Sequence, residues 1–460
     1  MCEYDEGTSA TDAHSLTSYG NPGPRVAQIG DLLAFARFLA GEEELRMPGV
    51  GFIGFGGVKA GERVLLGADT HYDPDVVDAV ARALREKGAR VDIVIDDVGE
   101  DRQFNILDEI RVVIRREPWK KNPRRWEGVP WIEELAVSNK YDLLILGKGG
   151  PTPITEHRYE QFPWLTGEVF AARSTDYPRE LHTLINRKTW DVIWEEARGG
   201  SVHLTDPEGT DVTWTMWDEY YEAGKRRYFE ESPLWGHLHG HPPPPIVGKD
   251  TGTGVIAGTT NHFSQPYPRI KVQLDGGRVE KVDGGGGYGD AWREVLEEAR
   301  DTQYPCFPRK GLFWLWETAI GTNPKIARPS NIHMLSSGGF EWERRRSGVI
   351  HMGFGTRWRG PEEVWAGERG LVYGHLHVHL LFPTYEVTSR QGRKTKVIDN
   401  GRLTALDDPE VRKLAAKYGD PDELLSEDWI PQIPGINAPG SYEDYARDPL
   451  PHIYPAAKLA

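Results

Sequence analysis

The sequence predicts an α/β fold with two parts: an N-terminal parallel-sheet α/β domain, followed by a β-rich (α+β) domain. Two observations lead to this prediction. Residues 64–97 have the pattern of a strand, a helix and a second strand, and such units build parallel sheets. After about residue 231, short alternating runs are separated by Gly-rich turns, which is typical of antiparallel sheets. A chain of 460 residues is long enough for two or three domains.

The predicted domain boundaries follow changes in composition. Residues 1–25 are polar and rich in Gly, Pro and Ser, so we expect a flexible N-terminal tail. The α/β domain is predicted over residues 26–230 and the β-rich, metal-binding domain over residues 231–400. The His-, Pro- and Gly-rich run WGHLHGHPPPPIVG marks the start of the second domain or a loop over its site. Residues 401–460 are expected to form a C-terminal helix and a tail that wraps its own domain or a neighbouring subunit.

The strand–helix–strand unit carries the clearest local signals. The apolar run VLLGAD precedes a helix with Asp73 as N-cap and Pro74 at its first position, and Gly88 ends that helix before the strand VDIVIDD. The DTHYD loop at the helix N-terminus is compatible with anion binding. A role for Asp69 and His71 in fixing the loop is equally compatible with the sequence.

Other segments of the first domain are less specific. The run GVGFIGFGGVKAG is not followed directly by a helix, so it is not a dinucleotide-binding fingerprint. NKYDLLILGKGGPTPI predicts a buried strand that ends in a turn, where parallel strands open onto a cleft. The basic run RREPWKKNPRRW is a solvated loop, a clamp for a substrate carboxylate or a subunit contact. SVHLTD and DVTWTM predict a hairpin.

In the second domain, TGTGVIAGTTNHF and RIKVQLDGGRVEKVDGGGG predict strands joined by tight turns. The run GGGGYG is expected to lead into the helix DAWREVLEEAR. It is not a phosphate cradle, because no lysine or serine follows at the position that a P-loop requires.

Composition excludes several classes of partner. The net charge of −15 argues against nucleic acid or an anionic membrane as a partner, and favours a small-molecule substrate. Two cysteines are too few for a disulfide framework or a thiolate zinc site, which suits a reducing cytoplasm. Neither a signal peptide nor a run of eighteen apolar residues is present. We therefore expect a soluble cytoplasmic protein, with a homodimer as a possible assembly.

A candidate metal site is concentrated between residues 312 and 383. In the strand-like run VYGHLHVHLLF, side chains two apart point to the same face, so His375, His377 and His379 share one side. His351 lies in the apolar run GVIHMGFG, and Glu317 lies in WLWETAIG, where a buried carboxylate without a cation is costly. Any one of these residues alone is better explained as a hydrogen-bonded core histidine or a salt-bridged glutamate. Together they favour a metal site.

Further residues are candidates for the surroundings of that site. His262 and Asn261, in the turn GTTNHF, and Trp316 are predicted to face a substrate pocket. Tyr373 and His375 are predicted catalytic residues that move protons. His237, His239 and His241 have a spacing compatible with metal binding, but the neighbouring prolines leave their backbone path unpredictable.

The segments WETAIGTNPKIARP, GVIHMGFG and HLHVHLLF resemble, in order and approximate spacing, the metal-binding half of the thermophilic metalloprotease family of aminopeptidases. They also resemble the related 2,5-dihydroxypyridine 5,6-dioxygenases. Weaker similarity extends from about residue 32 to residue 398. The resemblance implies metal ligands at Glu317, His351 and His377, with His379 where the family usually has aspartate.

This chain departs from both relatives. The peptidases have another metal-binding glutamate where this sequence has the prolines of GHPPPPIVG. The dioxygenases hold a single iron, but they have histidine at the position of Glu317 and serine at the position of His351. Their catalytic histidine corresponds to Gly149 or Gly150.

We predict one divalent metal ion, with Fe(II) favoured and Zn or Mn possible, because a two-metal site needs bridging carboxylates that are missing here. The leading hypothesis is a non-haem iron oxygenase that acts on a small aromatic or heteroaromatic substrate. The alternative is an aminopeptidase-like or amidase-like hydrolase that uses a metal-activated water. A third possibility is a protein that binds a metal or ligand without catalysis.

Overall fold

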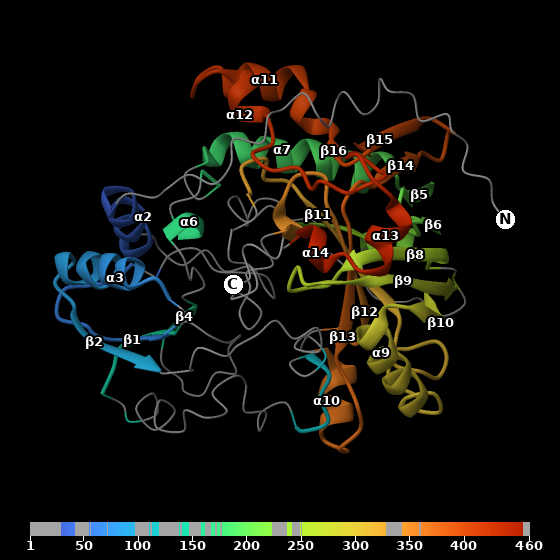
Figure 1. The fold of residues 1–460 in the computed structure, drawn as a ribbon, viewed down its shortest axis with the longest axis horizontal. Coiled ribbons are helices and arrows are strands. Elements are labelled where there is room, and N and C mark those ends of the chain that lie inside the picture. Colours follow the sequence, from blue (N-terminus) through green and yellow to red (C-terminus); the bar gives the residue numbers. More distant parts are fainter. Residues whose placement is uncertain are drawn as a thin grey trace.

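The structure is a computed structural model that describes residues 29–41, 55, 57–70, 72–96, 110, 113–118, 138, 140–146, 158–161, 167–170, 173–174, 177–222, 237–241, 249, 251–327, 343–357 and 360–453. These residues form two sheets with helices packed on them, so the predicted α/β fold with a β-rich second part is confirmed (Figure 1). No helix in the described ranges is long and apolar enough to cross a membrane.

The first sheet is parallel and has the strand order β2-β1-β3-β4 in the described residues. Its strands are β1 (Arg63–Asp69), β2 (Arg90–Asp96), β3 (Leu143–Leu146) and β4 (Arg158–Gln161). The helices α2 (Ile29–Gly41) and α3 (Pro74–Glu86) lie side by side over this sheet (Figure 1), with the short helix α6 (Gly167–Phe170) beside them. The strand, helix and strand expected from the sequence are therefore all present.

Asp73 explains how α3 begins. One carboxylate oxygen of Asp73 accepts a hydrogen bond from the N–H of Asp75 at 3.0 Å, and Pro74 occupies the first turn. The other oxygen accepts from the N–H of Gly167 at 3.2 Å. Asp73 thus stabilises the βα loop from within. His71 lies outside the described residues.

The second sheet is predominantly antiparallel and contains twelve of the described strands. Its main path is β16-β15-β14-β5-β6-β8-β13-β12-β11-β7, and β9 joins it by pairing with both β8 and β10. The strands are β5 (Ser201–Asp206), β6 (Thr210–Thr215), β7 (His237–His241), β8 (Thr253–Thr260), β9 (Pro266–Asp275), β10 (Arg278–Gly284), β11 (Leu315–Gly321), β12 (Ile350–Gly355), β13 (His375–Leu380), β14 (Thr384–Thr388), β15 (Lys394–Asp399) and β16 (Arg402–Leu403).

The predicted hairpin at residues 201–215 forms as β5 and β6, but it belongs to the second sheet. There β6 pairs with β8, and β5 pairs with β14. These two strands of the second sheet precede residues 230/231, where the sequence predicts a domain boundary, and that boundary stays a prediction. Alternating burial on both strands explains their place in the second sheet, because the apolar face of the hairpin joins the core of that sheet.

Helices and short turns surround the second sheet in the described residues. They are α7 (Arg179–Asp191), η2 (Val192–Glu196), α8 (Asp218–Glu222), α9 (Gly286–Glu298), η4 (Glu343–Arg345), α10 (Pro361–Gly367), η5 (Thr404–Asp407), α11 (Pro409–Ala415), α12 (Pro421–Leu425), α13 (Tyr442–Arg447) and α14 (Leu450–Ile453). Helix α9 contributes Trp292, which packs its ring against Phe313 and Phe354 in the main core.

The C-terminal segment is anchored to the second sheet by buried charges and apolar contacts. Arg346, which is fully buried, donates to Glu427 at 3.1 Å, and Lys325 Nζ lies 3.0 Å from a carboxylate oxygen of Asp428. Tyr445 belongs to a small core cluster that also includes Phe382. The wrapping tail expected from the sequence therefore packs on its own chain as far as it is described.

Candidate metal centre

Three neighbouring strands, β11, β12 and β13, align the predicted ligands in two rows. Glu317 of β11 is opposite Gly353 of β12, which is opposite His377 of β13. In the next row, His351 of β12 is opposite His379 of β13. Residues opposite one another share a face of the sheet, so the row pairing alone places the carboxylate and the histidines on one face.

The other face of the same strands is apolar. Leu376, Val378 and Leu380 alternate with the histidines of β13 and are fully buried in the main core, together with Met352 and Phe354 of β12. This alternation holds the histidines on the opposite side because a slip by one residue would bury them in the core.

Gly353 leaves the space that the site needs. A Cβ atom added to Gly353 would lie 3.0 Å from Oε2 of Glu317 and 3.3 Å from Cδ2 of His377. Any side chain at this position would therefore push the carboxylate and the imidazole apart.

His262 reaches the site from the turn that follows β8. Asn261 is fully buried and organises this turn: its Oδ1 accepts from the N–H groups of Phe263 and Gln265, both at 3.0 Å. The amide of Asn261 also donates to the side chain of Gln265 at 3.0 Å. Asn261, which the sequence predicts to bind substrate, forms its hydrogen bonds within the turn. These bonds stabilise the turn that carries His262.

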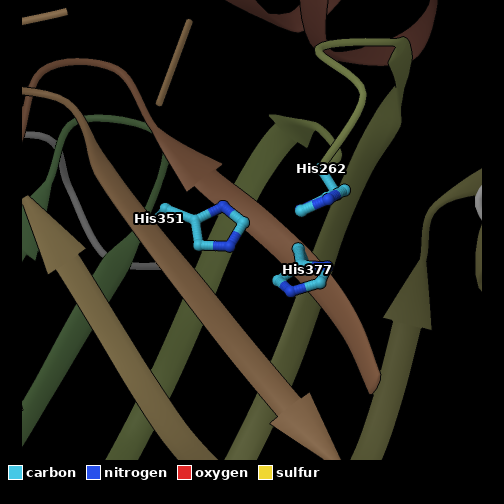
Figure 2. Close-up of side chains that lie close together, drawn as sticks. All are labelled: His262, His351 and His377. Atoms are coloured by element: carbon cyan, nitrogen blue, oxygen red, sulfur yellow. The ribbon is translucent and has the colours of Figure 1, made fainter. Parts of the chain in front are cut away.

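His262, His351 and His377 form the candidate metal centre. One ring nitrogen from each lies within 4.8 Å of the other two. The ring of His377 stacks on those of His262 and His351, each with centroids 4.3 Å apart, and Figure 2 shows the three rings gathered between the turn and the two strands. Oε2 of Glu317 lies 3.6 Å from Nε2 of His351 and 3.9 Å from Nε2 of His377. Glu317 therefore borders two of the three imidazoles.

Electrostatics favour the neutral form of His351 and His377. Burial, together with the charge of Arg344 and the neighbouring histidines, holds the pKa of His351 well below its usual value. Burial and the same neighbours lower the pKa of His377 in the same way. A neutral imidazole keeps one lone pair, which is the form that binds a metal.

The buried carboxylate of Glu317 interacts with the buried guanidinium of Arg344. Burial lowers the pKa of Arg344 to about 10, and attraction to Glu317 acts in the opposite direction. The charge of Arg344 offsets part of the energy required to bury Glu317.

The backbone of His377 is fixed from α9. The hydroxyl of Tyr288 donates to the carbonyl of His377 at 3.1 Å and lies 3.3 Å from its N–H. Tyr288 is fully buried and stacks on Tyr267. This contact limits the movement of the central histidine of β13.

His379, a predicted metal ligand, lies beside His351, and its predicted metal role stays a prediction. Its Nε2 lies 2.8 Å from Nδ1 of His351, and its Nδ1 lies 2.7 Å from Oε1 of Glu343. Both ring nitrogens are therefore engaged with protein atoms. The structure places His379 behind the cluster, in contact with His351, and not among the three grouped histidines.

His375 and Trp316 lie next to the centre on its other side. The ring of His375 is 4.8 Å from that of His377 and meets the indole of Trp316 edge-on at 5.1 Å. Nδ1 of His375 is 4.0 Å from Oε1 of Glu363. The indole N–H of Trp316 is buried and has no hydrogen-bond partner within the described residues. These two predicted residues are thus brought together beside the cluster.

Tyr373 is buried and contacts the main chain of another segment. Its hydroxyl donates to the carbonyl of Glu117 at 2.5 Å, and its ring packs in the main core next to Gly367. The catalytic role predicted for Tyr373 stays a prediction.

Two carboxylates near the centre were not identified from the sequence. Glu343 belongs to the run EWERRRS, whose charges are typical of a surface, and Glu363 lies in the first turn of α10. Both are buried. A charged run next to an apolar strand was the available signal for Glu343.

Of the histidines in β7, only the backbone is described. His239 is opposite Ala319 of β11, and His237 is opposite Gly321. Their predicted metal role stays a prediction.

The chain matches no protein-family model and no curated protein. Among solved structures, it is similar to the 2,5-dihydroxypyridine dioxygenase from Pseudomonas putida KT2440, with 12% sequence identity, a TM-score of 0.42, and coverage of 82% of this chain and 98% of that chain. It is also similar to wild-type AmpT from Thermus thermophilus, with 14% identity, a TM-score of 0.40, and coverage of 81% and 99%. The low identities and TM-scores describe a distant similarity of fold and assign no activity to this chain.

Proposed function

We propose that this protein is a metal-dependent enzyme in which His262, His351 and His377 hold one divalent cation, with Glu317 as the adjacent carboxylate. The observation that carries the proposal is the convergence of three ring nitrogens within 4.8 Å of one another, on imidazoles of which two are buried and one is partly buried. Burying polar ring nitrogens requires free energy unless they find partners, and a shared cation would be a partner for all three.

The donor set favours one cation over two. A pair of dications about 3.5 to 4 Å apart requires bridging carboxylates to offset their mutual repulsion. Among the described residues that border the three imidazoles, Glu317 is the carboxylate within 4 Å. The carboxylate of Glu343 is separated from the cluster by His379.

The same donors favour Fe(II), with zinc and manganese as alternatives. Two or three imidazoles and one carboxylate on the same side of a cation, with other positions open, are typical of non-haem iron oxygenases. Three imidazoles are also a known set for catalytic zinc. When bound, such a cation supplies either O₂ activation or an acidic water.

We propose oxidation of a small aromatic or heteroaromatic substrate as the preferred chemistry. The indole of Trp316 meets the ring of His375 edge-on, and His375 adjoins His377, so a planar substrate can stack or pack edge-on against these rings. The buried N–H of Trp316 can donate to an oxygen on that substrate. His375 can take up or release its proton.

One observation supports the hydrolytic alternative. If Glu317 stays 3.6 to 3.9 Å from the imidazole nitrogens and does not bind the cation, its carboxylate is suitably placed to accept a proton from water. In that case a peptide-like or amide bond would be the substrate.

Metal analysis and two activity measurements test the proposal. Protein purified without added metal is expected to contain one equivalent of iron, and to consume O₂ when supplied with dihydroxy-heteroaromatic compounds. Zinc at one equivalent, together with amine release from dipeptides, would support hydrolysis. Two equivalents of metal, or none after reconstitution with Fe(II), Zn(II) and Mn(II), would contradict the single-metal centre.

The remaining expectations concern the environment of the enzyme. A small-molecule substrate, a cytoplasmic location and a homodimer are proposed on composition and charge alone. Sedimentation of the purified protein would test the homodimer.

A further inference from the structure

A chain of hydrogen bonds runs from the candidate metal centre into the protein behind it. Nδ1 of His351 lies 2.8 Å from Nε2 of His379, and Nδ1 of His379 lies 2.7 Å from Oε1 of Glu343. Thr260 donates its hydroxyl to the same oxygen at 2.8 Å. All four side chains are fully buried, so bulk water does not compete for these bonds.

The donors and acceptors in this chain determine where its protons lie. Oε1 of Glu343 already accepts from Thr260, as a carboxylate does, and it accepts again from the Nδ1–H of His379. A neutral imidazole with its proton on Nδ1 is an acceptor at Nε2. With His379 in this neutral form, His351 donates from Nδ1, which leaves a lone pair on its Nε2.

Glu317 opposes this arrangement, but it is farther away. A carboxylate near Nε2 of His351 favours a proton on that nitrogen, whereas the chain of hydrogen bonds favours a proton on Nδ1. Oε2 of Glu317 lies 3.6 Å from Nε2, which is too long for a hydrogen bond, and the contacts of the chain are 2.7 and 2.8 Å. The shorter contacts determine the tautomer.

We infer that Glu343 and His379 are positioning residues that fix His351 in its Nδ1–H form and direct the lone pair of Nε2 toward the metal. This inference rests on the proposed metal centre and gives His379 a role other than direct coordination. A histidine suits this position of β13 because one ring nitrogen donates to Glu343 while the other accepts from His351.

The expected effect on metal binding is moderate. Residues that orient a metal-binding histidine through hydrogen bonds change metal affinity by about 10- to 100-fold when they are replaced. Loss of His351 itself should abolish the site. An intermediate effect therefore distinguishes a positioning residue from a ligand.

The tautomer can be observed directly in the unaltered protein. We propose ¹⁵N imidazole NMR on the metal-free full-length chain, with His351 assigned by the loss of its signals in His351→Asn. The expected spectrum shows an unprotonated Nε2 and a protonated Nδ1 for His351. A protonated Nε2 would overturn the inference without any variant that alters folding.

Variants test the consequence for metal binding. Glu343→Gln can donate to Nδ1 of His379 and so allow the reversed tautomer, and we expect Co(II) affinity to fall about 10- to 100-fold by dye competition. His379→Leu should have a similar effect. His379→Gln can both donate and accept, and should recover most of the affinity. The matched control is His203→Gln, which removes an exposed histidine that lies 2.9 Å from Asp211.

The outcomes separate this inference from the proposed function. If the unaltered chain binds Co(II) tightly and Glu343→Gln, folded by circular dichroism, binds it equally well, the positioning role is wrong while the metal centre stands. If the unaltered chain binds no divalent metal but the ¹⁵N spectrum shows the expected tautomer, the fixed Nδ1–H form of His351 stands, and both the proposed function and the role of Glu343 and His379 in metal binding are wrong.

Discussion

Strand β13 has a histidine at each end, and the two histidines differ in their contacts with neighbouring side chains. At one end, His379 is fully buried and both its ring nitrogens contact protein atoms within 2.8 Å. At the other end, His375 is 6% exposed, and its nearest described carboxylate oxygen, on Glu363, is 4.0 Å away. Each histidine has a buried glutamate nearby, but only one of the two pairs is within hydrogen-bond distance.

The comparison shows that a buried glutamate can hold a neighbouring histidine through a short hydrogen bond, as Glu343 does, or lie too far away to form one, as Glu363 does. A histidine held between two short hydrogen bonds has a fixed tautomer and suits the support of a ligand. His375, 4.0 Å from its nearest described carboxylate oxygen, is the histidine to which the proposed function assigns proton transfer. His377 lies between the two and carries the metal in the proposed function.

The largest effect is expected from His377→Ala, which removes the histidine between the two ends. The stacked rings of His262 and His351 would lose their common neighbour, and the cation would lose a ligand. Metal content should fall to background and activity should disappear, while circular dichroism should stay close to that of the unaltered chain. Retention of the metal would show that the ligands are assigned incorrectly.

His375→Gln tests the other end of the strand. If His375 moves protons, kcat should fall by about 10²- to 10⁴-fold. Metal affinity should remain unchanged because His375 does not belong to the cluster of three. Both kcat and metal affinity should be measured on the same preparations of His375→Gln and of the unaltered chain. A loss of metal in this variant would erase the proposed difference between the two ends.

Gly353→Ala should have a smaller effect on both measurements. The added methyl group would lie 3.0 Å from the carboxylate of Glu317 and 3.3 Å from His377, so one of them must move. We expect weaker metal binding with little change in thermal stability. Gly370, with nothing within 4 Å of an added Cβ but a positive φ of 65°, offers a control for backbone strain alone. Unchanged metal affinity in Gly353→Ala would show that the centre can adjust its geometry.

The last prediction concerns the free energy of unfolding and a buried histidine outside the site. His182 donates to or accepts from Thr322 at 3.0 Å, and burial lowers its pKa to about 3. The unfolded chain, with an ordinary pKa near 6.5, binds a proton first, so His182 lowers stability as pH falls from about 6.5 to 3, by about 1.4 kcal/mol per unit.

Urea unfolding gives the free energy of unfolding of His182→Gln and of the unaltered chain over this pH range. The difference between the two free energies should change with pH by that slope. Asp206 acts in the opposite direction, because burial raises its pKa to about 6 and its protonated form stabilises the fold at lower pH. Taking the difference between two chains that both contain Asp206 removes its contribution. A flat difference would mean that His182 is protonated in the folded chain.

Much of the fold could be predicted because its signals are local. The helix cap at Asp73 and the alternation along β13 are both properties of neighbouring residues, and the structure contains both. The convergence of Glu317, His351 and His377 follows from that alternation once three strands are adjacent.

The remaining parts of the site depend on long-range pairing. His262 reaches the cluster because β8 meets β13, where the register pairs Thr260 with His379. Glu343 is buried next to His379 in a charged 3₁₀ turn that is distant in sequence. A charged run is typical of a surface turn, and its position next to an apolar strand was too weak a signal to place Glu343 beside His379.

The buried pair of Arg346 and Glu427 has a consequence for biosynthesis. Arg346 follows directly after the η4 turn that carries Glu343, and its charge is balanced by an acid from a segment made about eighty residues later. A nascent chain that has emerged only as far as β16 lacks this partner. We therefore expect the turn behind His379 to settle only after Glu427 has been made and has packed against Arg346, so that uptake of the proposed cation follows that step.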